Sequence, residues 1–141
     1  MKIKIKLAHV NAKVPTYAHI SDGCFDLYAA DKVYDPANNM IEYDTGVVFE
    51  IPDDHVGLVF MRSSVCKTPH LLRNGVGVID SSYRSTVKFK FLAVSPNPEQ
   101  YEVGNRVGQM MIIPRPKIEF DVADELTEGE RGESGFGGSG K

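Results

Sequence analysis

Short segments that alternate apolar and polar side chains recur along the chain, and this pattern limits its fold more than any other feature. They cover residues 2–7, 47–51, 56–61, 86–94, 107–113 and 118–122. A period of two is typical of β-strands that bury one face. No apolar pattern with the period of a helix persists, and we expect at most a short helical turn over 65–68, capped by Ser63 or Ser64.

Clusters of Asp, Asn, Pro and Gly separate the alternating segments, as at 35–39, 52–54 and 96–98. Many short strands with such punctuation predict an all-β fold, a jelly-roll-like sandwich or barrel. A chain of 141 residues can form one domain with a core that needs no disulfide or structural metal. We expect a β-domain over 1–128 and a separate glycine-rich arm over 129–141.

Composition argues against several classes of protein. The formal net charge is -3, so the chain lacks the excess of Lys and Arg that non-specific nucleic-acid binding requires. No segment approaches the roughly 18–20 apolar residues that cross a bilayer, and the alternating start does not look like a signal peptide. Cys24 and Cys66 match no metal-ligand spacing. We therefore expect a cytoplasmic protein with reduced thiols, no zinc, no nucleic-acid partner and no membrane association.

The tail over 129–141, GERGESGFGGSGK, has two interpretations on composition alone. It cannot bury enough apolar area to fold by itself, which indicates a disordered tail. The other interpretation is an anion-binding flap. Glycine amides can converge on phosphate oxygens, Arg131 supplies a forked cation, and Phe136 can stack on a ring.

The segment 72–85, LRNGVGVIDSSYRS, contains the most chemically informative residues. An apolar run over 76–79 ends at Asp80, and the next expected strand begins a few residues later, which predicts a hairpin with a carboxylate near its bend. Asp80 as a turn residue and Tyr83 as a packing residue are the structural alternatives to a role in a site.

Five segments, taken in order, resemble the five motifs of the homotrimeric dUTP diphosphatases (dUTPases). They are DGCFDLYAA (22–30), MRSS (61–64), NGVGVIDSSYR (74–84), VGNRVGQ (103–109) and RGESGFGGSG (131–140). The resemblance extends from about residue 3 to 141. One such motif is a weak signal, whereas five collinear motifs are a strong one.

The resemblance implies hydrolysis of dUTP to dUMP and pyrophosphate, by attack of water at the α-phosphorus with Mg²⁺ spanning the triphosphate. This reaction keeps uracil out of DNA and supplies dUMP for dTMP synthesis. It needs a positioned water, neutralised charge and a held substrate. By resemblance, Asp80 orients the water or accepts its proton, and Asp26 acts on Mg²⁺ through water.

The resemblance also assigns the residues that bind substrate. Backbone groups of the predicted hairpin read the uracil edge, and the Tyr83 ring packs under the deoxyribose, where it excludes a 2′-hydroxyl. A backbone that matches uracil leaves unpaired polar groups against cytosine. The implied base and sugar contacts are Asn74, Gly77, Val78 and Tyr83, and the implied phosphate and tail contacts are Arg62, Ser63, Ser64, Gln109, Arg131, Phe136, Gly137 and Ser139.

In this family the site is shared by three subunits, so the resemblance implies a homotrimer with three sites. Several positions depart from the family pattern. Cys24 stands where glycine is usual and Asn105 where aspartate is usual. Ser82, Ser85, Ser134 and Gly138 are further departures, and Lys67 lies off the expected spacing and receives no role.

Two other functions compete with the dUTPase interpretation. A dCTP deaminase shares the fold and several motifs, but the segment 80–83 and the tail with Phe136 resemble the diphosphatase version. A nucleotide-gated binding module, in which dUTP controls docking to a regulatory protein partner, would suit a compact trimer with a mobile tail. The sequence does not identify such a partner, and the enzyme is the function we favour.

Overall fold

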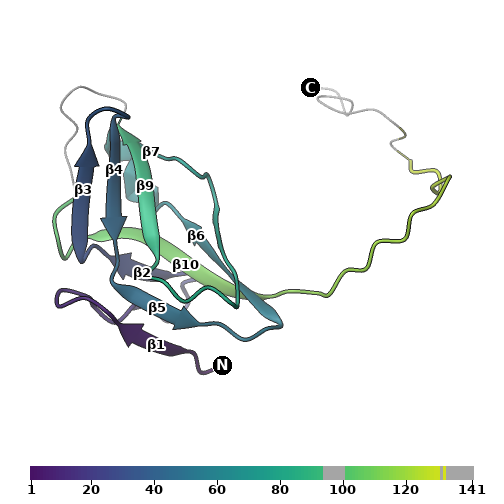
Figure 1. Ribbon diagram of the computed structural model, residues 1–141, viewed down its shortest axis with the longest axis horizontal. Helices are drawn as coiled ribbons and strands as arrows, with labels where there is room; N and C mark the ends of the chain where they lie inside the picture. Colours follow the sequence, from purple (N-terminus) through teal and green to yellow (C-terminus); the bar gives the residue numbers. More distant parts are fainter. Residues whose placement is uncertain (94–100, 131, 133–141) are drawn as a thin grey trace.

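The computed structural model describes residues 1–93, 101–130 and 132. These residues form short strands and one 3₁₀ helix (Figure 1). The elements are β1 (Lys4–Leu7), β2 (Phe25–Tyr28), β3 (Asp31–Asp35), β4 (Met40–Asp44), β5 (Val47–Glu50), β6 (His55–Phe60), η1 (Ser63–Lys67), β7 (His70–Leu72), β8 (Gly77–Ile79), β9 (Lys88–Ala93) and β10 (Arg106–Pro114). No helix in the described part of the chain is long and apolar enough to span a membrane.

The strands form three antiparallel sheets. Their orders are β1-β5, β2-β10-β6-β8 and β3-β4-β9-β7. The two four-stranded sheets pack against each other, and the alternation predicted from the sequence determines which side chains lie between them. In β9, for example, Phe89 and Phe91 are fully buried whereas Lys88 and Lys90 point outward. The predicted all-β, jelly-roll-like fold is confirmed.

Aromatic and branched side chains from both four-stranded sheets form one core. Tyr43 and Phe91 meet edge to face, with ring centroids 5.8 Å apart, and Phe89 stacks beside Phe91 at 6.4 Å. From the other sheet, Leu27 and Met110 are fully buried against them. Each such side chain contributes about 1.5–3 kcal/mol when it is removed from water. This core holds β2 and β10 in place, and both strands carry residues of the candidate site.

Two predictions about local structure are wrong. The segment 76–79 does form β8, but β8 pairs with β6, whereas β9 pairs with β4 and β7. The predicted hairpin is therefore a crossover between two sheets. The predicted helical turn forms as η1, but its predicted cap is wrong. Ser63 and Ser64 lie within η1, and Arg62 occupies the N-cap without a side-chain cap bond.

The predicted strand over 118–122 is also absent. Arg115 donates its backbone N–H to the Asp54 carbonyl at 2.6 Å, and beyond this bond the chain leaves the sheets as an extended segment (Figure 1). All residues from 116 to 130 are exposed. A strand needs a hydrogen-bonding neighbour, and the described part of one chain offers none there.

His70 is a buried titratable group in the core. Its ring stacks on Tyr101 and meets the edge of Phe91, each with centroids 5.7 Å apart. Neither ring nitrogen has a hydrogen-bond partner among the described residues, and burial lowers the pKa of the imidazole. The unfolded chain therefore binds a proton more readily than the folded chain, and stability falls as the pH drops below about 6.5.

We predict that His70→Phe stabilises the protein by about 1–3 kcal/mol, because it removes two unsatisfied buried nitrogens and keeps the aromatic packing. It should also flatten the loss of stability as the pH drops below about 6.5. Urea unfolding at several pH values measures both effects. His19→Gln, at a largely exposed histidine, is the control and should keep the pH dependence. An unchanged pH slope in His70→Phe would contradict this account.

Candidate functional site

Strand β10 joins the two strands that carry the first group of predicted site residues. Gln109 of β10 lies opposite Asp26 of β2 on one side and opposite Phe60 of β6 on the other. The Gln109 side-chain amide donates to the Met61 carbonyl at 2.9 Å, so it also holds the chain that leaves β6 towards Arg62. Sheet pairing thus brings Asp26, Gln109 and Arg62 to one place.

Asp26 is the centre of this group. Its side chain is only 9% exposed, and both carboxylate oxygens accept hydrogen bonds from arginines. Arg62 Nε donates to Oδ1 at 2.8 Å, and Arg106 Nη1 donates to Oδ2 at 3.0 Å. Charge-assisted bonds of this kind are about twice as strong as neutral ones. Arg62 Nη1 also donates to Ser64 Oγ at 3.2 Å, so Asp26 fixes Arg62 and Arg62 holds the start of η1.

A pocket of about 320 Å³ opens beside this carboxylate. Its lining residues are Ala18, Asp22, Gly23, Cys24, Asp26, Arg62, Ser63 and Gln109. A second hollow of about 350 Å³ shares Arg62 and includes Arg106 and Asn105. A larger hollow of about 460 Å³ lies elsewhere, between β1, β5 and Arg84. We assign the site to the pocket at Asp26, because there polar groups from three segments converge on one cavity.

Cys24 and Asn105, the two departures from the family motifs nearest this pocket, both have a visible role. Cys24 lines the pocket, and burial together with the charge of Asp26 raises the pKa of its thiol. Its backbone does not adopt a positive φ, so a glycine is not required there. Asn105 Oδ1 accepts the Glu102 N–H at 2.8 Å, which closes the turn before β10.

Arg106 is a site residue to which the sequence interpretation gave no role. It follows Asn105 in the fourth motif, and a basic residue beside the start of a strand was the available signal. Only the pairing of β10 with β2 brings its guanidinium to Asp26.

The second group of predicted residues lies along β8 and the turn that follows. Gly77 is buried, and a Cβ there would lie 2.4 Å from Val59 Cγ2 and 3.0 Å from the Asn74 side-chain amide. Glycine is thus required for β8 to approach β6. Val78 and Asp80 are exposed, and the Tyr83 N–H donates to the Asp80 carbonyl at 3.1 Å.

One chain keeps the two groups apart. Asp26 and Gly77 lie on opposite edge strands of the sheet β2-β10-β6-β8, which places them about 14 Å apart at the usual strand spacing. The two groups are also apart in the direction of the strands. Ile79, the residue before Asp80, pairs with Gly57, and the extended backbone from Gly57 to Arg62 spans about 16 Å. The structure therefore brings together Asp26, Arg62, Ser63, Ser64 and Gln109, and separately Asn74, Gly77, Val78, Asp80 and Tyr83. The predicted tail residues Arg131, Phe136, Gly137 and Ser139 lie outside the described residues.

We predict that Asp26→Ala destabilises the protein by about 1–3 kcal/mol, because it leaves two arginines without their shared acceptor. Urea unfolding measures this change. Glu50→Gln is the matched control: Glu50 forms an exposed pair with Lys4 at 2.9 Å, and its loss should cost less than about 1 kcal/mol. Equal effects of the two substitutions would show that Asp26 does not organise the cluster.

Comparison with known proteins supports one family. The dUTPase family model matches residues 10–140. The deoxyuridine 5′-triphosphate nucleotidohydrolase of Clostridium tetani is 33% identical over 99% of this chain and 97% of its own length. The structure of Staphylococcus bacteriophage 80alpha dUTPase with dUPNHPP superposes with a TM-score of 0.85 at 26% identity, covering 99% of both chains.

A mutant dUTPase from phage phi11 of S. aureus, whose structure reveals the coordination of a structural Mg(II) ion, has the same fold. Its TM-score is 0.76 at 22% identity, over 89% of this chain and 99% of that one. The match of the family model covers most of this chain, including the Asp26 pocket and the β8 segment. The chain therefore belongs to the dUTPase family.

Proposed function

We propose that this chain is a dUTP diphosphatase that hydrolyses dUTP to dUMP and pyrophosphate by attack of water on the α-phosphate. The observation that carries the proposal is the pocket at Asp26, where Arg62, Ser63 and Gln109 are held in place beside a buried carboxylate. The reaction would remove dUTP from the nucleotide pool, so that uracil is kept out of DNA, and supply dUMP for dTMP synthesis. We place this activity in the cytoplasm.

Arg62, Ser63 and Ser64 bind the phosphates in this proposal. The Arg62 guanidinium uses Nε for Asp26 and one N–H of Nη1 for Ser64, so the remaining N–H groups of its fork can point to phosphate oxygens. Because Asp26 fixes the guanidinium beforehand, little side-chain entropy is lost when substrate binds. Gln109 adds a polar contact from β10.

Asp80 orients the attacking water. It is an exposed carboxylate just after β8, in a turn closed by the Tyr83 N–H, so its oxygens are open to solvent and can accept a hydrogen bond from water. Asn74, Gly77 and Val78 read the uracil edge through the backbone of the same segment. The exposed face of Val78 and the close approach allowed by Gly77 support this role.

Magnesium is the cofactor in this proposal. Mg²⁺ keeps several waters and is commonly held by one or two carboxylates together with substrate phosphates. The described residues fit that mode, because Asp26 supplies one carboxylate in the pocket that Arg62 and Ser63 also line. Both Asp26 oxygens accept arginine N–H bonds, and a water between Asp26 and Mg²⁺ would leave both bonds in place. When bound, the ion neutralises charge on the triphosphate.

We propose that the active unit is a homotrimer with shared sites. One chain keeps Asp80 away from the Asp26 pocket, so a second copy must supply it. The extended segment supports assembly as well: Ile118, Phe120 and Val122 are 68%, 92% and 95% exposed. Three large apolar side chains on one face of an extended segment need a covering surface.

The glycine-rich arm over 129–141 closes over the site in this proposal. Arg131 and Ser139 hold the γ-phosphate, and Phe136 and Gly137 cover the uracil. Ordering this arm costs backbone entropy, so it closes only on the full triphosphate.

We predict that the full-length chain releases pyrophosphate from dUTP with Mg²⁺, but not from UTP, dTTP or dCTP, and not in EDTA. A chain truncated before Arg131 should lose most of this activity because the γ-phosphate is no longer held. A pyrophosphate-release assay with the four nucleotides measures both effects. Ammonia release from dCTP would instead indicate a deaminase, and tight dUTP binding without turnover would indicate a binding module.

We predict that Asp80→Asn folds and still binds dUTP but loses at least about a hundredfold in kcat, since the water is no longer oriented by a carboxylate. Single-turnover kinetics and calorimetric titration with a non-hydrolysable dUTP analogue separate the two effects. Asp35→Asn, at the end of edge strand β3 in the other four-stranded sheet, is the control and should keep wild-type turnover. Unchanged turnover in Asp80→Asn would exclude Asp80 from the mechanism.

A further inference from the structure

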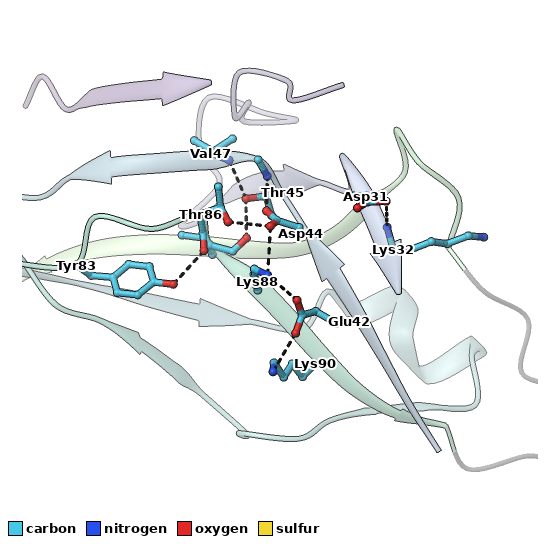
Figure 2. A network of polar contacts seen from close by, with 12 residues as sticks. Asp31, Lys32, Glu42, Asp44, Thr45, Val47, Tyr83, Thr86, Lys88 and Lys90 are labelled. Carbon is cyan, nitrogen blue, oxygen red and sulfur yellow. Dashed lines mark hydrogen bonds and ion pairs between the residues drawn. The ribbon is translucent and has the colours of Figure 1, made fainter. Parts of the chain in front are cut away.

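The ring of Tyr83 is held by its hydroxyl group. The side chain lies at the surface, 39% exposed, in the crossover between β8 and β9. Its hydroxyl donates to the Thr86 carbonyl at 3.1 Å, as Figure 2 shows. A ring that the core does not enclose can turn about its side-chain torsions, so this bond restricts where the ring lies.

The Thr86 carbonyl is itself fixed, because it belongs to an anchored peptide. A trans peptide is planar, with N–H and C=O on opposite sides. The Val87 N–H of the same peptide donates to the Val47 carbonyl at 3.0 Å. Val87 is fully buried, and its own carbonyl accepts from the Thr45 hydroxyl at 2.8 Å. The body of the protein therefore fixes one side of this peptide and presents the other side to Tyr83.

The Thr86 side chain provides a second anchor. Its hydroxyl donates to Asp44 Oδ2 at 2.8 Å, and Asp44 Oδ1 accepts the Gly46 N–H at 2.7 Å (Figure 2). Gly46 adopts φ +65°, and a Cβ there would lie 2.6 Å from His9 Cβ, so this turn is closely packed. Lys88 Nζ lies 3.4 Å from Asp44 Oδ2 and balances its charge.

We propose that Asp44 and Thr86 are positioning residues for Tyr83, and that through it they set the preference for a 2′-deoxyribose over a ribose. The inference rests on the proposed function, in which the Tyr83 ring packs under the sugar. Excluding one hydroxyl requires a ring that cannot move aside. The two residues supply that rigidity from β4 and from the start of β9, without touching the nucleotide.

The test compares substitutions at Thr86. Thr86→Val removes the hydroxyl and keeps the shape, Thr86→Ser keeps the hydroxyl, and Asp44→Ala removes the acceptor. We expect the ratio of kcat/KM for dUTP to that for UTP to fall by about tenfold in Thr86→Val and Asp44→Ala. Most of the change should be a gain with UTP, and Thr86→Ser should restore the ratio.

Lys90→Met is the matched control. It breaks the Lys90–Glu42 ion pair, 2.9 Å long on the same face of the sheet, and leaves Asp44 and Thr86 intact. Glu42 keeps its bond to Lys88 at 2.6 Å, so the variant should fold normally and leave the ratio unchanged. If Thr86→Val and Asp44→Ala lose stability but keep the ratio, their role is structural only and the proposal is wrong.

A second measurement does not depend on turnover. In protein labelled with 3-fluorotyrosine, Tyr83→Phe assigns the Tyr83 ¹⁹F resonance. We expect Thr86→Val to shift or sharpen this resonance towards that of a freely turning ring, and an unchanged resonance would overturn the proposal. If wild-type protein fails to hydrolyse dUTP, the proposed function fails. The resonance then still reports whether Thr86 positions Tyr83.

Discussion

The carboxylate of Asp26, with an arginine on each oxygen, is the interaction on which the site depends. A buried carboxylate without partners would cost several kcal/mol, so this position is tolerable only with both arginines in place. Arg62 comes from the segment after β6 and Arg106 from the start of β10, whereas Asp26 lies on β2. The ion pairs therefore join three segments, and they orient Arg62 before any substrate arrives. Both arginines retain contact with water, which limits the desolvation cost of the cluster.

The second constraint is the width of the sheet β2-β10-β6-β8. Because β2 and β8 occupy its two edges, residues on them cannot meet within one chain. A site that needs both Asp26 and Asp80 must then form between copies, each of which supplies a different edge. The residues at the two edges are also held in place by different interactions. The group at Asp26, which we propose binds the phosphates, is built around a buried carboxylate paired with two arginines, whereas the turn with Asp80 and Tyr83 is exposed and is anchored at Thr86.

Sequence patterns predicted burial well and pairing poorly. The alternation over 86–94 places Phe89 and Phe91 inside and Lys88 and Lys90 outside, as the structure has them. The same pattern does not identify the neighbours of a strand in its sheet. For this reason the sequence wrongly predicts that β8 and β9 form a hairpin. The sequence patterns do not predict the strands over 31–35 and 40–44, since charged residues interrupt both, at 31, 32 and 35 and at 42 and 44. Arg106 could not be assigned a role, because its partner is eighty residues away in sequence.

The segment over 118–122 shows what such a disagreement can mean. The alternation of apolar and polar residues in this segment is typical of a strand with one buried face. Such a strand forms where another surface packs against its apolar side chains. In one chain Phe120 and Val122 are almost completely exposed, which is costly for side chains of this size. The sequence pattern therefore predicts that these apolar side chains are buried, whereas in a single copy of the chain they are exposed. The separation of Asp26 from Asp80 points the same way, although it arises from sheet order and not from hydrophobicity. Two properties of the chain thus support assembly. The exposed face over 118–122 does so without the motifs that indicate dUTP, whereas the separation of the two carboxylates does so because those motifs assign both to one site.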